Sequence, residues 1–200
     1  MAFTAVFGGT FNPPHIGHYQ MLEALENSEI VEKILLMPDR VPPHKICDFL
    51  AADSDRIEMC RIMAQDFSKA ELCLIEFERA GKSYSYDTVS LLKARFPEIE
   101  LAFVCGGDML MSFEKWYKFE ELMKLVPFIV FGRSDILPEE LKFKVNQLSN
   151  MGMKIIPMKE KITAAASSQI RKNIGESAEL LPPKVYNYIK EKGIYSAGEI

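Results

Sequence analysis

The sequence predicts an α/β fold with a doubly wound, mainly parallel sheet. Short apolar runs alternate along the chain with segments that have the spacing of helices. Strands that are apolar throughout are typical of parallel sheets, because helices cover both faces of such sheets. Polar residues suited to ligand contact follow directly after several of these runs, and ligands of these sheets bind beyond the carboxyl ends of the strands.

The individual elements follow from local patterns. The predicted strands are the apolar runs at residues 3–7, 33–38, 71–77, 101–105, 127–131 and 154–156. A first helix is predicted from the one-face spacing of His18, Met21, Leu22 and Leu25. A second is expected to begin at an N-cap, Asp53 or Ser54, and to continue through Phe67. Further helices are predicted over residues 86–96 and 138–148, and a loop over residues 39–53.

The composition is that of an ordinary globular protein, predicted to form one domain over residues 1–200. Hydrophobic residues make up 48% of the chain and charged residues 26%. No apolar run approaches the ~20 residues of a membrane-spanning helix, and the N-terminus has no basic segment before an apolar one, so a cytoplasmic protein is predicted. The net charge of −4 argues against nucleic-acid binding, which favours a basic surface.

The cysteines give no sign of a metal site. Cys47, Cys60, Cys73 and Cys105 do not form a C-x-x-C pair. Cys73 and Cys105 lie in apolar runs and are expected to pack in the core. We therefore expect reduced thiols and no structural metal.

Residues 8–18, with the sequence GGTFNPPHIGH, are the strongest functional signal. They join a predicted strand to the start of a predicted helix. The glycines let the backbone approach a ligand closely, and the N–H groups and dipole of the helix N-terminus favour phosphate. His15 and His18 lie at the start of this helix and can both donate hydrogen bonds to phosphate oxygens.

Other interpretations of this segment are weaker. Neither G-x-x-x-x-G-K-[ST] nor G-x-G-x-x-G occurs here, so the common phosphate-loop and dinucleotide fingerprints are missing. The histidine pair could bind zinc, but no third ligand is obvious nearby. His18 alone would be explained best as a packed core histidine, whereas the pair favours phosphate binding.

Two other segments bring positive groups after predicted strands. In residues 41–45, a Pro-Pro pair presents His44 and Lys45, which alone would suggest only a solvated loop. In residues 167–171, a serine N-cap with phosphate-binding hydroxyls precedes Arg171, whose planar guanidinium suits triphosphate oxygens. An ordinary capped helix is the alternative there.

Four further segments hold residues that could contact a ligand. Gly106 and Asp108 follow the fourth predicted apolar run, and Arg133 follows the next one. Trp116 is the only tryptophan, and although packing is its ordinary role, it could stack on a planar cationic ring. Residues 83–88 are equally compatible with a simple turn and helix cap.

Residues 9–18 resemble the signature G-x-F-[DN]-P-x-H-x-G-H of the nucleotidyltransferase superfamily, whose Rossmann-like members transfer a nucleotide from a triphosphate. Asn12 stands where aspartate is commoner. The remaining segments resemble the bacterial nicotinate-nucleotide adenylyltransferase family: residues 42–45, 83–88, 106–117, 167–171 and 181–195. One further departure is Ala166, where that family usually has serine.

The resemblance implies an enzyme that joins ATP and nicotinate mononucleotide into deamido-NAD and pyrophosphate, with Mg²⁺. It implies that the pyridine ring stacks on Trp116 and that the nicotinate carboxylate meets backbone N–H groups near Thr88 and Tyr117. The implied catalytic residues are His15, His18, Lys45 and Arg171. Those implied for ATP binding are Gly8, Gly9, Thr10, Phe11, Gly106, Asp108, Ser167, Ser168 and Ile170. Those implied for mononucleotide binding are His44, Thr88, Trp116, Tyr117 and Arg133.

This chemistry needs no general base, because the second pKa of a phosphate monoester is near ~6 and the nucleophile is already largely dianionic. The lack of a carboxylate cluster in the sequence favours Mg²⁺ held by the triphosphate. The alternatives are a related transferase acting on another substrate, such as phosphopantetheine, and a non-catalytic nucleotide sensor. The sequence leaves open the choice between nicotinate and nicotinamide mononucleotide, and whether the chain forms a homodimer.

Overall fold

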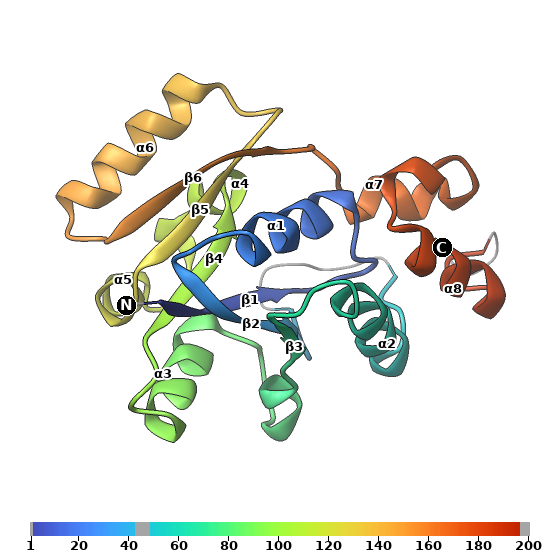
Figure 1. Ribbon diagram of the computed structural model, residues 1–200, viewed down its shortest axis with the longest axis horizontal. Coiled ribbons are helices and arrows are strands. Elements are labelled where there is room, and N and C mark those ends of the chain that lie inside the picture. The colour runs from blue at the N-terminus through green and yellow to red at the C-terminus, as the bar shows by residue number, and fades with distance from the viewer. Residues whose placement is uncertain (1, 43–48, 197–200) are drawn as a thin grey trace.

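A six-stranded parallel sheet forms the centre of the protein (Figure 1). The computed structural model describes residues 2–42 and 49–196. The strands are β1 (Phe3–Gly9), β2 (Val31–Pro38), β3 (Ala70–Leu72), β4 (Leu101–Gly106), β5 (Phe128–Arg133) and β6 (Ile155–Ile162). Their order is β3-β2-β1-β4-β5-β6 and every pairing is parallel, which confirms the predicted fold class. The strand order changes direction between β1 and β4, where such folds open a ligand crevice.

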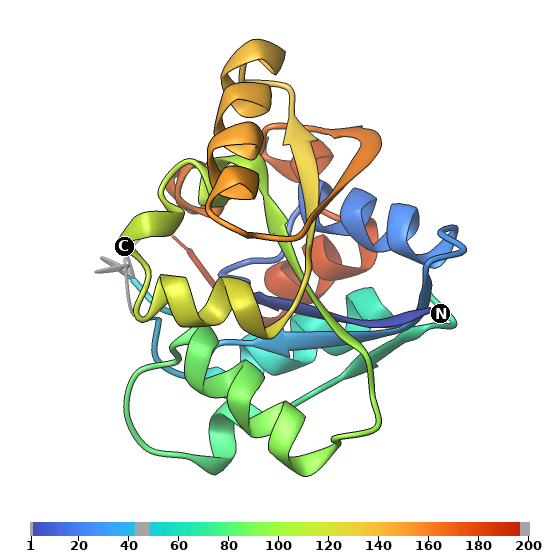
Figure 2. The same ribbon diagram turned by 90° about the vertical axis from the view of Figure 1, so that its left-hand side faces the viewer.

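Helices cover both faces of the sheet (Figures 1 and 2). The first core cluster includes side chains from α1 (Ile16–Glu26), α2 (Asp53–Ala64), α7 (Ser167–Lys172) and α8 (Pro183–Lys192). The second includes side chains from α3 (Ser85–Arg95), α4 (Gly107–Leu110), α5 (Phe119–Leu125) and α6 (Pro138–Asn150). Figure 1 shows α2, α7 and α8 together at one end of the molecule.

Strand β1 belongs to both cores because successive side chains of a strand point to opposite faces. Ala5 and Phe7 pack in the first cluster, whereas Val6 packs in the second. All three side chains are at most 3% exposed. Burial on both faces explains why the β1 sequence is apolar without alternation.

The structure corrects the prediction of a strand over residues 71–77. Only Ala70–Leu72 pairs with β2, and Ile75–Glu78 form a 3-10 helix instead. This turn brings Glu76 inward, where its carboxylate accepts a hydrogen bond from the Thr88 hydroxyl. The contact between Thr88 and Glu76 joins distant parts of the chain, so the apolar run at residues 71–77 could not indicate it, and it favours the 3-10 helix over a longer strand.

The predicted start and end of the second helix are also wrong in detail. The N-cap position of α2 is Ala52, which offers no side-chain cap, so neither Asp53 nor Ser54 has that role. The helix ends at Ala64, and the more distant Phe67 packs on Tyr19 with ring centroids 4.9 Å apart. Tertiary packing thus holds Phe67 without a helical backbone.

At the other edge, β5 and β6 are longer than predicted. Arg133 ends β5 rather than following it, and it pairs with Ile162 beyond a register shift that lies between Val130 and Gly132. The second half of β6 is polar and mostly exposed, as an edge strand can be, so its sequence has no apolar run. The helices near residues 86–96 and 138–148 are confirmed within two residues at each end.

Of the described residues, no helix combines the length and apolar composition that crossing a membrane would need. Cys60, Cys73 and Cys105 are free thiols, and burial raises the pKa of Cys60 and Cys105. Core packing is thereby confirmed for Cys105, while Cys73 is only partly buried. Cys47 lies outside the described residues.

Candidate active site

Several of the predicted site residues lie at the carboxyl ends of strands. Gly8 and Gly9 end β1, Gly106 ends β4 and Arg133 ends β5. We call residues 8–18 the motif loop; it leads directly from β1 into α1. Because the strands are parallel, these ends meet on one edge of the sheet, at the position expected for a ligand crevice.

Phe11 shapes the first part of the motif loop. Its backbone has φ +47°, which is uncommon for a bulky residue, and its side chain is only 1% exposed. A Cβ on Gly9 would come within 3.0 Å of the Phe11 ring, so glycine is needed there for close packing. The Phe11 side chain is thus a core residue, and only its backbone remains for the ATP contact predicted for it.

The two histidines of the motif loop stack on each other. The ring centroids of His15 and His18 lie 3.7 Å apart at an interplanar angle of 21°. The backbone N–H of His15 donates to Nδ1 of His18 at 3.1 Å. Since this nitrogen accepts, neutral His18 carries its proton on Nε2, which can donate to an oxyanion. Contacts with Phe7 and Phe11 hold the His18 ring, so the packed-histidine interpretation was correct in part.

Gly17, between the histidines, permits a close approach by a distant segment. A Cβ at this position would lie 2.9 Å from the Thr163 carbonyl and 3.2 Å from the His15 ring. The Thr163 N–H also donates to Gln20 Oε1 at 2.8 Å. The segment after β6 therefore packs against the first turn of α1, a role of Gly17 that sequence reasoning missed.

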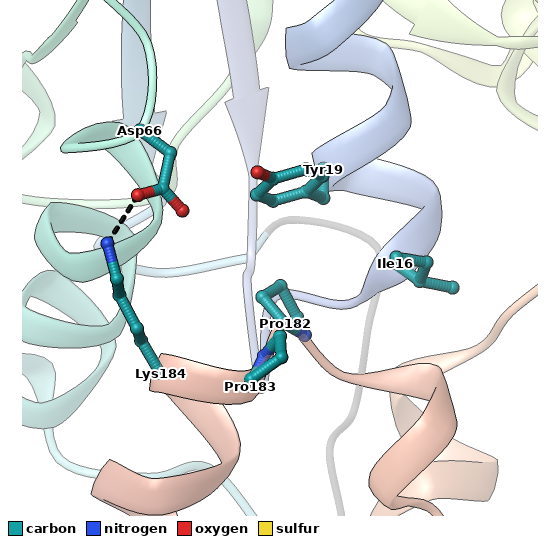
Figure 3. A pocket seen from close by; sticks show the side chains of 6 residues that line it. All are labelled: Ile16, Tyr19, Asp66, Pro182, Pro183 and Lys184. Carbon is teal, nitrogen blue, oxygen red and sulfur yellow. Dashed lines mark hydrogen bonds and ion pairs between the residues drawn. The ribbon is translucent and has the colours of Figure 1, made fainter.

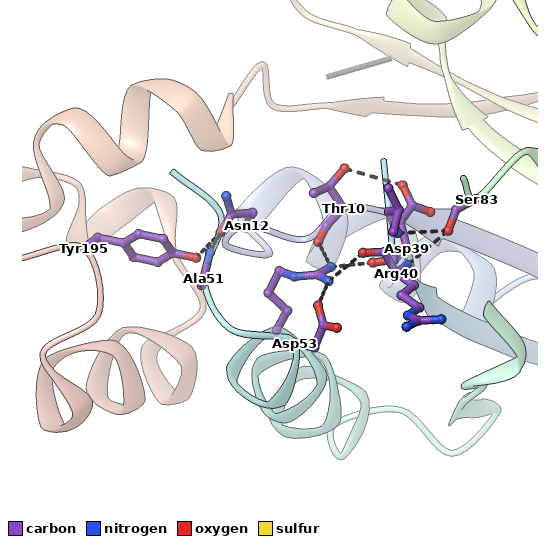
Figure 4. A network of polar contacts seen from close by, with 10 residues as sticks. Thr10, Asn12, Asp39, Arg40, Ala51, Asp53, Ser83 and Tyr195 are labelled. Carbon is purple, nitrogen blue, oxygen red and sulfur yellow. Dashed lines mark hydrogen bonds and ion pairs between the residues drawn. The ribbon is translucent and has the colours of Figure 1, made fainter. Parts of the chain in front are cut away.

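Asn12 joins the motif loop to two remote parts of the chain (Figure 4). Its Oδ1 accepts hydrogen bonds from the Ala51 N–H at 3.1 Å and the Tyr195 hydroxyl at 2.7 Å. Its Nδ2 donates to the Phe49 carbonyl at 2.8 Å. Asn12 is 1% exposed, and an aspartate could not make the last contact. The neutral amide therefore suits its surroundings at this position, where the resemblance implied that aspartate is commoner.

Helix α7 also contacts the motif loop. Arg171 Nη1 donates to the Asn12 carbonyl at 2.8 Å, and Ser167 Oγ donates to the Pro13 carbonyl at 2.8 Å. The N-cap is Ala166 rather than a serine, so that part of the prediction is wrong. The Ser167 hydroxyl thus donates to the motif loop in this structure, and its contact with phosphate stays a prediction. Ser168 is exposed, and the Ile170 side chain is buried.

A second group of predicted residues is aromatic. We call Tyr84, Tyr86, Trp116 and Tyr117 the aromatic cluster. Trp116 packs on Phe103 and Phe113, with ring centroids 5.9 and 5.4 Å away, and stays half-buried. Tyr117 is 42% exposed and lies 4.5 Å from Tyr84 and 6.3 Å from Tyr86 between ring centroids. These contacts place Tyr84 and Tyr86 beside Tyr117, which directly follows Trp116 in the chain.

Thr88 takes part in a buried polar network. Its hydroxyl donates to Glu76 and accepts from Arg79 Nη2 at 2.7 Å, and the residue is 1% exposed. Its backbone N–H already donates to the Tyr84 carbonyl at 3.1 Å. The N–H groups that precede it in the first turn of α3 lack intrahelical acceptors, as at every helix start. These first-turn N–H groups, rather than the N–H of Thr88, are therefore the donors suited to a carboxylate.

Asp108 and Arg133 form an ion pair at the ends of β4 and β5. Arg133 Nη1 lies 3.0 Å from Asp108 Oδ2, and its Nε lies 3.0 Å from Asp135 Oδ1. A Cβ on Gly106 would come within 2.5 Å of Asp108 Oδ1, so a larger residue at this strand end would displace the Asp108 side chain from its present position. This ion pair joins Asp108, which is predicted to bind ATP, with Arg133, which is predicted to bind the mononucleotide.

Ser83 bonds the backbone directly after β2 (Figure 4), and it directly precedes Tyr84 of the aromatic cluster in the chain. Its hydroxyl accepts from the N–H groups of Arg40 and Val41 at 3.1 and 3.2 Å, and its N–H donates to the Val41 carbonyl at 2.9 Å. Ser83 is 5% exposed, and its position in the Ser-Tyr segment was the only available signal. The predicted residues His44 and Lys45 lie outside the described residues.

A hollow of about 340 Å³ lies elsewhere, between α1, the end of α2 and the start of α8 (Figure 3). The Lys184–Asp66 ion pair closes one side of it, with Nζ and Oδ1 2.5 Å apart. None of the predicted site residues lines this hollow. Residues 2–42 and 49–196 contain no group of three or more His, Cys, Asp or Glu side chains that could hold a metal ion.

Known proteins match the chain over nearly its full length. The cytidylyltransferase-like family profile matches residues 6–173. The chain is 35% identical to the nicotinate-nucleotide adenylyltransferase of Bacillus subtilis over 195 residues, covering 96% of this chain and 97% of the relative. It is 38% identical to a probable nicotinate-nucleotide adenylyltransferase of Listeria welshimeri over 190 residues, covering 95% of each.

Solved structures agree on the fold. The nicotinic acid mononucleotide adenylyltransferase of Plasmodium falciparum, complexed with NaAD, superposes with a TM-score of 0.77 at 21% identity and covers 98% of each chain. The family profile and the curated relatives each match most of the sequence. The chain therefore belongs to the nicotinate-nucleotide adenylyltransferase family of cytidylyltransferase-like proteins.

Proposed function

We infer that the chain is an enzyme of NAD biosynthesis that joins ATP and nicotinate mononucleotide into deamido-NAD and pyrophosphate. One observation carries this proposal beyond family membership. The motif loop with its stacked histidines follows β1, and Ser83, which precedes the tyrosines of the aromatic cluster, bonds the backbone that follows the neighbouring strand β2. A phosphate-binding region beside an aromatic region suits a pyridine mononucleotide that attacks a triphosphate.

The motif loop is proposed to bind the phosphates undergoing reaction. The nucleophile is the dianionic 5′-phosphate of the mononucleotide, which attacks the α-phosphate of ATP and displaces pyrophosphate. His18 Nε2 and the N-terminus of α1 would donate to phosphate oxygens as charge develops. Arg171 has further N–H donors beyond the one used on Asn12, and these would meet triphosphate oxygens. His15 and Lys45 retain the catalytic roles that the resemblance implies.

The aromatic cluster is proposed to select the pyridine nucleotide. The half-buried Trp116 offers a rigid ring on which a cationic pyridine can stack. The first-turn N–H groups of α3 and the backbone near Tyr117 would bind the nicotinate carboxylate. Backbone donors prefer the anionic nicotinate form to the neutral nicotinamide form, since a charged acceptor makes the stronger hydrogen bond.

The remaining predicted contacts stay proposals. Gly106 and Asp108 would lie along the adenosine and ribose, while Ser168 and the backbone of Ile170 would face the adenine. Mg²⁺ would arrive with ATP and neutralise charge on the triphosphate. The described side chains form no metal cluster, and no step above depends on a protein-bound ion. A cytoplasmic location, a single domain and a homodimer likewise stay proposals.

The test is release of pyrophosphate from ATP and Mg²⁺, measured in parallel with nicotinate mononucleotide and nicotinamide mononucleotide. We expect rapid release with the nicotinate form and a much lower kcat/KM with the nicotinamide form. Equal values for both would overturn the proposed carboxylate site. Release of pyrophosphate only with phosphopantetheine would assign the chain to another substrate. If none of these acceptors led to release, a non-catalytic nucleotide sensor would be the remaining alternative.

A further inference from the structure

Arg56 on α2 is a fully buried arginine that no sequence motif singled out. Its side chain is 0% exposed, and its guanidinium donates to three backbone carbonyls. Nη1 lies 3.0 Å from the Thr10 carbonyl and 2.6 Å from the Asp39 carbonyl, and Nη2 lies 3.4 Å from the Arg40 carbonyl. A single side chain therefore bonds the backbone directly after β1 and directly after β2.

Asp53 supplies the charge that balances Arg56. Its Oδ1 lies 2.5 Å from Arg56 Nη2, one turn earlier on the same helix, and its side chain is 48% exposed. The acceptors of the guanidinium thus come from three separate elements, around the start of α2 (Figure 4). Only a planar fork with several fixed donors can satisfy acceptors in so many directions.

Burial of this charge is costly, and stability alone does not explain it. Apolar residues of similar volume often replace a buried ion pair without loss of stability. Arg56 Nε is, moreover, buried without a hydrogen-bond partner among the described residues. What the arginine provides that an apolar side chain cannot is a fixed spacing between the two strand ends.

The spacing between the ends of β1 and β2 affects the position of the motif loop. Thr10 is the first residue after β1, and its carbonyl is held by Arg56. Asp39 and Arg40 directly follow β2, and the Arg40 N–H donates to the hydroxyl of Ser83, which precedes Tyr84 of the aromatic cluster. Phosphoryl transfer depends on an in-line arrangement, and misplacement by about 1 Å can reduce its rate by about 10²-fold.

We propose that Arg56 is a positioning residue for adenylyl transfer, which fixes the motif loop relative to the end of β2. It touches neither substrate and acts through the backbone of Thr10, Asp39 and Arg40. The inference rests on the proposed function. Its expected signature is a fall in kcat while binding of the mononucleotide is retained.

The test compares Arg56→Met and Arg56→Lys with a matched control on the same helix. Met59 is 0% exposed and packs in the first core cluster, so Met59→Ala should lower the melting temperature while it removes none of the hydrogen bonds that Arg56 makes. The measurements are kcat for pyrophosphate release, the melting temperature and mononucleotide binding. Trp116 is the only tryptophan, so quenching of its fluorescence reports binding of nicotinate mononucleotide directly.

We expect Arg56→Met to lower kcat by at least about tenfold and to leave the Kd for nicotinate mononucleotide within about twofold. Arg56→Lys should lower kcat as well, because one ammonium cannot serve both strand ends in the same geometry. Met59→Ala should keep kcat within about twofold below its melting temperature.

A folded Arg56→Lys protein with the kcat of the wild type would overturn the inference, whether or not Arg56→Met folds. An equal fall in kcat for Met59→Ala at the same loss of melting temperature would also overturn it, since the effect would then follow stability alone. If the wild type itself releases no pyrophosphate, the proposed function fails first, which separates the two results.

Discussion

The motif loop and the aromatic cluster are held in place by different forces. The motif loop is fixed by buried polar groups: Asn12 and Arg56 are each at most 1% exposed and bond remote backbone. The aromatic cluster is held by ring packing, and Tyr117 is 42% exposed. The two regions also draw on different cores, since Phe7 and Phe11 lie in the first and Phe103 and Phe113 in the second.

This difference matches the two tasks of the enzyme. Stabilising charge that develops during phosphoryl transfer needs donors fixed before the reaction, and satisfied buried networks provide such donors. Holding a pyridine ring needs a flat, accessible surface instead. Substitutions in the motif loop should therefore lower kcat, whereas those in the aromatic cluster should raise KM for the mononucleotide.

The largest effect is expected from His18→Ala. Loss of the Nε2 donor should lower kcat by about 10²-fold or more, because the contact strengthens in the transition state. The KM for nicotinate mononucleotide should change little. Steady-state kinetics on protein with a native circular dichroism spectrum checks both values, and a near-normal kcat would remove His18 from the catalytic group.

A smaller effect is expected from Trp116→Ala. A stacked cationic ring contributes about 2 kcal/mol when desolvated, so KM for nicotinate mononucleotide should rise about 30-fold. The kcat at saturation should stay close to that of the wild type. Trp116→Phe is the matched control, because it keeps a flat ring and should recover most of the affinity. An unchanged KM in both variants would argue for a substrate without a pyridine ring.

Tyr195→Phe tests the polar support of the motif loop. The buried hydroxyl donates to Asn12 Oδ1, and removing it should cost about 1–2 kcal/mol of unfolding free energy. Tyr84→Phe is the matched change in the aromatic cluster and should cost less, because Tyr84 is only partly buried. Urea denaturation of the two variants measures the difference. Equal losses would show that the two regions do not differ in polar support.

The smallest effect concerns pH and the segment that carries Trp116. The hydrogen bond from Lys144 lowers the pKa of Glu114, although burial opposes the shift. The pair therefore stabilises the fold fully above the ordinary glutamate pKa of 4.5, and this stabilisation is lost as pH falls through the lower folded value. In Glu114→Gln, the decrease in melting temperature between neutral and acid pH should be about 2 °C smaller than in the wild type, and kcat at pH 7 should be unchanged. An unaltered acid profile would contradict the assignment.

Much of this architecture could be predicted from sequence because its signals are local. Apolar runs buried on both faces revealed the central strands, and the glycines and histidines of the motif loop indicated phosphate binding. The contacts that position these residues were not predictable, because they join distant positions. Tyr195 bonds Asn12 across 183 residues, and Arg56 lies in a helix with no distinguishing pattern. Only the first residues of the edge strand β6 were predicted, because its exposed second half has no apolar run.

The most direct test of the division between the two regions is a double-mutant cycle on His18→Ala and Trp116→Ala. The kcat/KM for nicotinate mononucleotide is measured at saturating ATP for the wild type, both single variants and the double variant. The His18 ring packs on Phe7 and Phe11 of the first core cluster, whereas the Trp116 ring packs on Phe103 and Phe113 of the second, so the logarithmic losses should add to within about 0.5 kcal/mol. A double variant little worse than His18→Ala alone would show that the two regions act as one unit, contrary to this account.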